Sequence, residues 1–310
     1  MPHEDRNLGK GAAIFIALQA VMFVFLMTAL HLFVDTEGVF TSSTGWIYEW
    51  LTYFGVTGCL IFVLWHSALS KGFWRGFAAA FITIFIAWVA EYLGITYGWV
   101  FGPYHYTRVF QPQIFGVPLL ICMAWEPILY ASYLMTDWLL PCDLSKEKSF
   151  AKKLIPIFFM AICGGILTTV WDLMVDPVSV QRGYWIWHEG GPYMSDIFGG
   201  VPISNYIGWF SVAFVCHIIY RLFLETAPKT RHSIYLNVYS PLFLYLTLFL
   251  AFAGYSLWFI QRLDVLMIGI LAMGGILILG FSKLYLTRFA KAGEVLNRFE
   301  SIDDVGIIRK

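Results

Sequence analysis

Hydrophobic residues dominate eight long stretches of the chain, and polar or turn-forming residues are concentrated between them. The stretches lie near residues 12–34, 46–69, 74–95, 116–139, 154–175, 203–224, 234–260 and 264–286. Each reaches the roughly 20 residues that an α-helix needs to cross a hydrocarbon core of about 30 Å. The pattern predicts an all-α fold, a polytopic transmembrane helical bundle of about eight spans that forms a single integral-membrane domain over residues 1–310.

Composition and charge add an orientation to this picture. Hydrophobic residues make up 59% of the chain and charged residues 13%, which is too little charge to cover a soluble protein. If the N-terminus is inside, the outer loops contain only Arg108, Arg182 and Arg262 of the 20 Lys and Arg residues. The positive-inside rule then predicts a protein of the cell membrane with both termini cytoplasmic, including a charged tail at about 291–310. Nothing in the sequence suggests a nucleic-acid partner.

The five cysteines and seven histidines are scattered along the chain. No C-x-x-C pair occurs, and no two histidines are spaced i, i+4 to place two ligands on one helix face. Ordinary packing accounts for the cysteines, and interfacial hydrogen bonding accounts for the histidines. We therefore expect no metal site.

Two stretches of the chain share an order of polar and turn residues. The first contains Glu91, Gly98-Trp99, Gly102-Pro103-Tyr104, Gly116-Val117-Pro118 and Trp125; the second contains Asp176, Gly183-Tyr184-Trp185, Gly191-Pro192-Tyr193, Gly200-Val201-Pro202 and Trp209. In both, seven residues separate the carboxylate from the first glycine and the last proline from the tryptophan. Turn chemistry alone explains the shared Gly and Pro but not the matched carboxylate and Trp. We predict a tandem helix–loop–helix repeat, with units at about 75–139 and 154–224, enclosing a site between them.

Four carboxylates lie in the helices that flank the two loops, and they are the predicted catalytic residues. They are Glu91, Glu126, Asp172 and Asp176. Ionisable groups within spans are costly and usually face a cavity or a partner. Asp172 and Asp176 share a helix face, and Pro177 should end or kink that helix. Crowding of acids in apolar surroundings favours an uncharged carboxylic acid that can donate a proton. The alternative is that these acids pair with arginines and only hold helices together.

Aromatic side chains are dense around the same layer. Part of this density is the interfacial belt of Trp and Tyr found in most membrane proteins. Faces of Trp and Tyr also stabilise cations, so an acid with an aromatic lining could protonate an alkene and hold the resulting carbocation. The predicted substrate-binding residues are Trp125, Tyr184, Trp185, Asn205, Trp209 and Tyr104.

Three segments carry a resemblance to a known family. They are Trp171-Asp172-Leu173-Met174-Val175-Asp176-Pro177-Val178, Gly183-Tyr184-Trp185-Ile186-Trp187 and Gly200-Val201-Pro202-Ile203-Ser204-Asn205-Tyr206-Ile207-Gly208-Trp209, joined by an earlier signature at Glu91-Tyr92-Leu93-Gly94 and Phe101-Gly102-Pro103-Tyr104-His105-Tyr106. Over roughly residues 85–220 the chain resembles the membrane carotenoid biosynthesis family, whose characterised members are carotenoid 1,2-hydratases.

The resemblance implies a hydro-lyase that adds water to the terminal double bond of an acyclic carotenoid end group and forms a tertiary alcohol. Its partners would be a lipophilic carotenoid that enters from membrane lipid, and water. In the mechanism that we expect, Asp172 or Asp176 delivers the proton, and the cation forms beside Trp125, Tyr184 or Trp209. A water held by Asn205 with Glu91 or Glu126 then adds to the cation. No cofactor is implied, and the chain has no G-x-G-x-x-G or P-loop motif.

Other functions remain open at the level of sequence. A lycopene cyclase-like reaction shares the proton transfer but captures the cation with an internal double bond. An aspartate-rich prenyltransferase would need a second acidic motif for magnesium, which the sequence lacks. A transporter would also use repeats and intramembrane acids, although acids gathered toward one side suit it less well.

Overall fold

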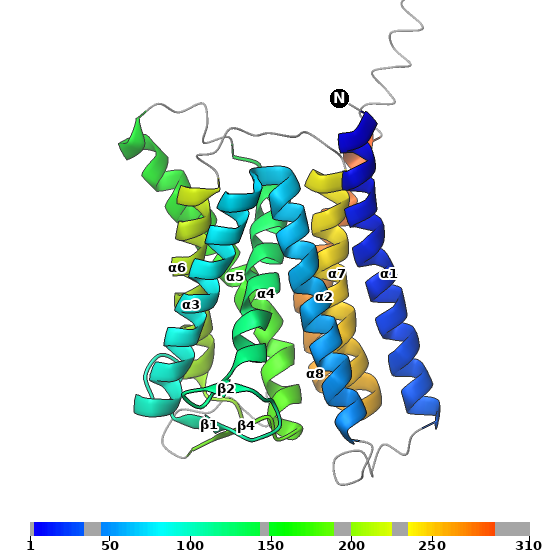
Figure 1. The fold of residues 1–310 in the computed structure, drawn as a ribbon, viewed down its shortest axis with the longest axis vertical. Coiled ribbons are helices and arrows are strands. Elements are labelled where there is room, and N and C mark those ends of the chain that lie inside the picture. Colours follow the sequence, from blue (N-terminus) through cyan, green and yellow to red (C-terminus); the bar gives the residue numbers. More distant parts are fainter. Residues whose placement is uncertain (1–2, 34–44, 143–148, 189–199, 225–234, 289–310) are drawn as a thin grey trace, which may run out of the picture.

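The computed structural model describes residues 3–33, 45–142, 149–188, 200–224 and 235–288. Eight helices in this part of the chain are long and apolar enough to cross a membrane, and they run side by side in one bundle (Figure 1). The predicted tail at 291–310 and the Gly191-Pro192-Tyr193 motif lie outside the described residues.

The helices match the predicted spans in number and order. They are α1 (His3–Phe33), α2 (Gly45–Lys71), α3 (Phe73–Tyr97), α4 (Leu119–Leu139), α5 (Phe150–Gln181), α6 (Ile203–Phe223), α7 (Ser240–Gly254) and α8 (Leu263–Gly269). Three π-helical segments, η3 (Tyr235–Tyr239), η4 (Tyr255–Phe259) and η5 (Ile270–Gly274), flank α7 and continue α8, so that the last two spans extend over Asn237–Trp258 and Leu263–Arg288.

Helix α4 lies at the centre of the bundle. It contacts α2, α3, α5 and α7, and every residue from Trp125 to Thr136 is buried. The outer helices instead expose large apolar side chains such as Phe81 on α3 and Ile155 on α5, as expected of surfaces that face lipid. Polar groups on the inner faces of α3, α5 and α6 are therefore enclosed by protein.

The two predicted units share local geometry at both ends of their loops. Gly98 and Gly183 have φ of +68° and +67°, and they terminate α3 and α5 in the left-handed conformation that favours glycine. Tyr184 N donates to Ser179 O at 3.0 Å to close the last turn of α5. Pro118 and Pro202, in extended conformation, are the N-caps of α4 and α6. Residues at matched positions of the two units therefore have the same backbone conformation at the ends of the helices.

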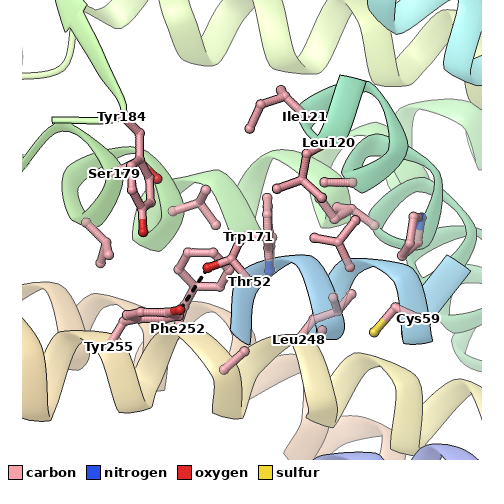
Figure 2. A pocket seen from close by; sticks show the side chains of 18 of the residues that line it. Thr52, Cys59, Leu120, Ile121, Trp171, Ser179, Tyr184, Leu248, Phe252 and Tyr255 are labelled. Atoms are coloured by element: carbon pink, nitrogen blue, oxygen red, sulfur yellow. Dashed lines mark hydrogen bonds between the residues drawn. The ribbon is translucent and has the colours of Figure 1, made fainter. Parts of the chain in front are cut away.

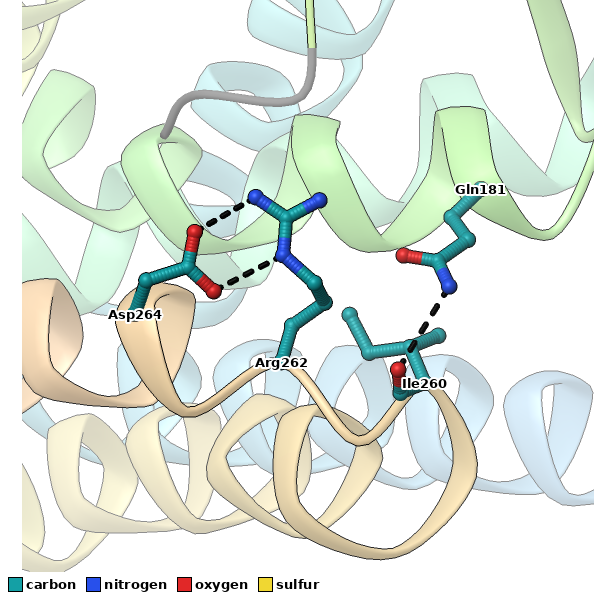
Figure 3. Close-up of polar contacts among 4 residues, drawn as sticks. All are labelled: Gln181, Ile260, Arg262 and Asp264. Carbon is teal, nitrogen blue, oxygen red and sulfur yellow. Dashed lines mark hydrogen bonds and ion pairs between the residues drawn. The ribbon is translucent and has the colours of Figure 1, made fainter. Parts of the chain in front are cut away.

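Helix α5 continues past Pro177 to Gln181, so of the two predicted effects of this proline, an end or a kink of the helix, the end does not occur. Proline removes one backbone donor, but the turn that follows is closed by Arg182 N donating to Val178 O at 3.0 Å. At the same end of the bundle, Gln181 Nε2 donates to Ile260 O at 3.4 Å, and Arg262 forms a bidentate ion pair with Asp264 (Figure 3). The hydrogen bond of Gln181 joins the end of α5 to the turn before α8, whereas the ion pair lies within the start of α8.

Short strands, which the sequence did not predict, organise the loops at one end of the bundle (Figure 1). Strand β1 (Tyr104–Tyr106) pairs antiparallel with β4 (Trp185–Trp187), and β2 (Gln113–Ile114) pairs with β3 (Val117–Pro118). The β1–β4 pair joins the loop of the first unit to the loop of the second. It lies across the ends of the helices that contain the carboxylates.

Candidate active site

Asp172 and Asp176 lie one turn apart on α5 and are 0% and 1% exposed. The side-chain amide of Asn205, in the first turn of α6, lies between them. Its Nδ2 donates to Asp172 Oδ2 at 2.8 Å and also to Asp176 Oδ2. One amide group thus bridges two buried carboxyl groups, which the i, i+4 spacing places on one face of α5. Asp172 Oδ1 is buried and has no hydrogen-bond partner among the described residues.

Glu91, near the end of α3, is held by three donors. Tyr106 OH donates to Oε2 at 2.8 Å and Trp125 Nε1 donates to Oε1 at 2.9 Å; Tyr104 OH also donates to Oε2. Burial and the adjacent Glu91 carboxyl raise the pKa of both tyrosines well above the usual range, so both phenols keep their protons. Two phenols and one indole therefore surround the Glu91 carboxyl group.

The β1–β4 pair forms a lid over these acids. Tyr104 and Tyr106 point inward from β1, while His105 between them is exposed, because side chains alternate along a strand. On β4, Trp185 Nε1 donates to Asp176 Oδ1 at 2.6 Å, and the Trp187 ring lies 4.9 Å from the Tyr104 ring. The lid therefore contributes side chains to both sets of carboxyl groups.

A small polar cavity of about 30 Å³, here named the acid pocket, lies between the carboxyl groups and the lid. Its lining comprises Glu91, Phe101, Tyr104, Tyr106, Ile121, Asp176, Trp185, Trp187, Asn205 and Trp209. A buried water needs about 10–15 Å³ and two or more polar partners, so the acid pocket has room for one or two water molecules.

Trp125 and Trp209, the matched tryptophans of the two units, stack beside this pocket with ring centroids 3.8 Å apart. Tyr184, the remaining aromatic residue of the predicted binding set, lies elsewhere. It packs with Phe110 and Leu120 and lines a second, apolar cavity. The structure thus places Trp185, Asn205, Trp209 and Tyr104 at the acid pocket and Trp125 directly behind it.

Glu126 lies apart from the other three carboxyl groups. It is 1% exposed and accepts a hydrogen bond from Tyr220 OH at 2.6 Å and another from Thr83. Among the described residues, neither Tyr220 nor Thr83 forms a hydrogen bond to Glu91, Asp172 or Asp176. The four predicted acids therefore divide into a group of three and a separate Glu126.

Four lining residues, Phe101, Tyr106, Ile121 and Trp187, were absent from the predicted set. The polar–aromatic alternation of Tyr104-His105-Tyr106 was the available signal for Tyr106, because it predicts two tyrosines on one face of a strand. Ile121 carried no signal, since it resembles any apolar residue of a span. Within the described residues, no group of three or more His, Cys, Asp or Glu is arranged to hold a metal ion.

Fold and site together define a class of protein: a polytopic helical membrane protein with a lidded carboxylate pocket at one end of its bundle. A family model for the carotenoid biosynthesis protein matches residues 50–276, which is most of the chain and includes every residue of the acid pocket. The chain belongs to the carotenoid biosynthesis protein family. No curated protein and no solved structure matches it.

Proposed function

We propose that this protein hydrates the terminal double bond of an acyclic carotenoid end group and produces a tertiary alcohol. The observation that carries the proposal is the acid pocket, a water-sized cavity bounded by Glu91, Asp176 and Asn205 and roofed by aromatic rings. A cation formed at its edge would lie beside a space that can hold the water molecule that captures it. Membership of the carotenoid biosynthesis family supplies the lipophilic substrate class.

The hydrogen bonds divide the roles among the acids. Glu91, which accepts from three donors at the edge of the acid pocket, is assigned the role of the base. Asp172 and Asp176 share one amide, and Asp172 retains a carboxyl oxygen that has no partner within the part of the chain that the structure describes. We therefore assign the catalytic proton to this pair. Asp176, which lines the acid pocket, is the member of the pair beside the reacting carbon.

The reaction proceeds in two steps and leaves the protein unchanged. The aspartate pair gives its proton to the less substituted alkene carbon, the π bond breaks, and a tertiary cation forms beside Trp185 and Trp209. A water in the acid pocket adds its oxygen to the cation and loses a proton to Glu91. Transfer of that proton through the pocket water back to the aspartate pair restores the starting state. The net change is the addition of one water molecule.

The lid end of the bundle is extracytoplasmic in this proposal, because few Lys and Arg residues lie in the segments that connect the helices there. Water then reaches the acid pocket from the aqueous phase past the lid, and the hydrocarbon reaches it from the membrane. The substrate would not need to cross the headgroup region.

Expression in a host that accumulates an acyclic carotenoid tests the reaction. We expect a product heavier by one water, which acquires oxygen-18 when the cells grow in labelled water. Asp172→Asn and Asp176→Asn should each lower product formation at least about 100-fold, the usual scale for loss of a general acid. Asp264→Asn, which alters a partly exposed acid at the same end of the bundle, is the matched control and should have little effect.

Three outcomes would contradict the proposal. A product of unchanged mass without the label would indicate cyclisation. Movement of a compound across vesicles without chemical change would indicate a transporter. Full activity of both aspartate variants would remove the acid from the mechanism.

A further inference from the structure

A second cavity, here named the apolar chamber, lies between α2, α4, α5 and α7 (Figure 2). Its volume is about 120 Å³, four times that of the acid pocket. Apolar side chains from all four helices line it, among them Val56, Leu120, Ile128, Trp171, Leu248 and Phe252. A cavity with such walls excludes water and accepts hydrocarbon.

Polar side chains, among them Gln19, Thr52 and Thr247, also line the chamber, but almost all of the surface that faces the cavity is apolar. At one end Thr52 Oγ1 and Tyr255 OH hydrogen-bond each other at 2.9 Å (Figure 2). The Arg182 guanidinium lies over the rings of Tyr184 and Tyr255, 5.1 and 4.9 Å from their centroids. The surface that faces the cavity therefore offers almost no polar anchor for a headgroup or a sugar. The occupant that fits is an uncharged hydrocarbon.

The chamber adjoins the acid pocket. Ile121 and Trp185 line both cavities, and no other residue is common to the two linings. Trp185 donates to Asp176 at 2.6 Å, so its ring has one edge at the acid and another part of its surface in the chamber. A hydrocarbon in the chamber would therefore lie within one side chain of the catalytic proton.

Size decides how much of a substrate can enter. A cavity of about 150 Å³ accommodates benzene, so about 120 Å³ holds little more than one isoprenoid unit. We infer that the apolar chamber is the binding subsite for the terminal isoprenoid unit of the substrate, and that the rest of the polyene extends toward lipid. This inference rests on the proposed function, since the acid pocket gives the end group its chemistry.

Chamber-filling variants test the subsite by a binding readout. Ala124 on α4 and Ala251 on α7 line the chamber from different helices, so Ala124→Leu and Ala251→Leu should each fill part of it. Ala151→Leu, on an exposed position of α5, is the matched control. The probe is lycopene, titrated into purified full-length protein in detergent and followed by quenching of tryptophan fluorescence. An Asp172→Asn background separates binding from turnover.

We expect the two chamber variants to bind lycopene at least tenfold more weakly than the parent, and Ala151→Leu to bind as the parent does. Thermal unfolding of each variant verifies that the fold persists. If one chamber variant fails to fold, the other decides the matter, because the two substitutions enter from separate helices. Lycopene binding as strong as that of the parent in the folded chamber variants would overturn the inference. The inference would also fail if these variants lost a phospholipid that co-purifies with the parent while their lycopene binding stayed unchanged.

The outcomes distinguish this subsite from the proposed function. Loss of product in Asp172→Asn with unchanged binding in Ala124→Leu would reject the subsite and keep the reaction. Full product formation in Asp172→Asn with weakened binding in Ala124→Leu would reject the acid assignment and keep the subsite.

Discussion

The indole rings of Trp125 and Trp209 lie face to face, with centroids 3.8 Å apart and planes inclined by 18°. The two residues occupy matched positions in the two helix–loop–helix units, seven residues after the proline of each Gly-Val-Pro motif. The contact between Trp125 and Trp209 therefore joins α4 of the first unit to α6 of the second. Only Trp125 has a second role that the hydrogen bonds show, since its Nε1 donates to Glu91.

This difference gives the first prediction. Trp125→Phe should lower the free energy of unfolding by about 1–2 kcal/mol more than Trp209→Phe, because it also removes a donor from a buried carboxylate. Both substitutions reduce the stacked area to a similar extent. Denaturant unfolding in one detergent measures the difference, and equal losses would mean that the Glu91 contact contributes nothing measurable.

Glu126 provides the second prediction. Glu126→Gln should retain product formation and most stability, because the amide oxygen can still accept from Tyr220 and Thr83. Glu126→Leu should lower the free energy of unfolding by about 1–3 kcal/mol, because the buried Tyr220 hydroxyl loses its acceptor. The Thr83 hydroxyl can still donate to Ala79 O at 3.0 Å. Product yield and unfolding of both variants are the measurements. A folded Glu126→Gln protein without activity would return this residue to the mechanism.

Close packing of the first loop on α6 gives the third prediction. A Cβ at Gly208 would lie 2.5 Å from Val100 O and 2.6 Å from the Phe101 ring. Gly208→Ala should therefore cost about 1–3 kcal/mol and disturb Phe101, which lines the acid pocket. Gly275→Ala is the control, because it meets no atom within 4 Å and gains up to about 1 kcal/mol of helix propensity. Thermal unfolding that ranks Gly208→Ala at or above Gly275→Ala would contradict this packing.

Orientation in the membrane is the fourth prediction. Gln111→Cys, exposed near the lid, should react with a membrane-impermeant maleimide in intact cells or spheroplasts. Lys152→Cys, exposed at the start of α5, should react only after the membrane is permeabilised. The unsubstituted chain reports the background from its own cysteines. The reverse labelling pattern would place the lid on the cytoplasmic side.

Sequence was sufficient to predict the eight spans, because membrane helices satisfy their backbone hydrogen bonds internally and need long apolar runs. It was insufficient for β1 and β4. Each strand is three residues long, and the pairing joins Tyr104 to Trp187, far apart in the chain. So short a segment shows too little alternation to predict a strand, and neither segment indicates its partner.

The sequence likewise predicted some residues of the site and missed the placement of others. Glu91, Asp172, Asp176 and Asn205 were predictable because each is a polar residue in an apolar span, close to a loop. The separate position of Glu126 was not, because depth along a helix does not fix the direction of a side chain. Trp125 faces Glu91, and the next residue is rotated by about 100°, so Glu126 instead faces Tyr220 and Thr83. That the two units are a true repeat stays a prediction.

The apolar chamber has a kinetic consequence for the proposed reaction. A space of about 120 Å³ encloses the tip of a polyene and is insensitive to the remainder. Carotenoids of different length with the same tip should therefore react at similar rates. A molecule with two such tips must withdraw and turn round between its two reactions, so the singly hydrated compound would accumulate before the doubly hydrated one. For the proposed reaction, this geometry predicts distributive turnover, with release of the substrate between the two hydrations.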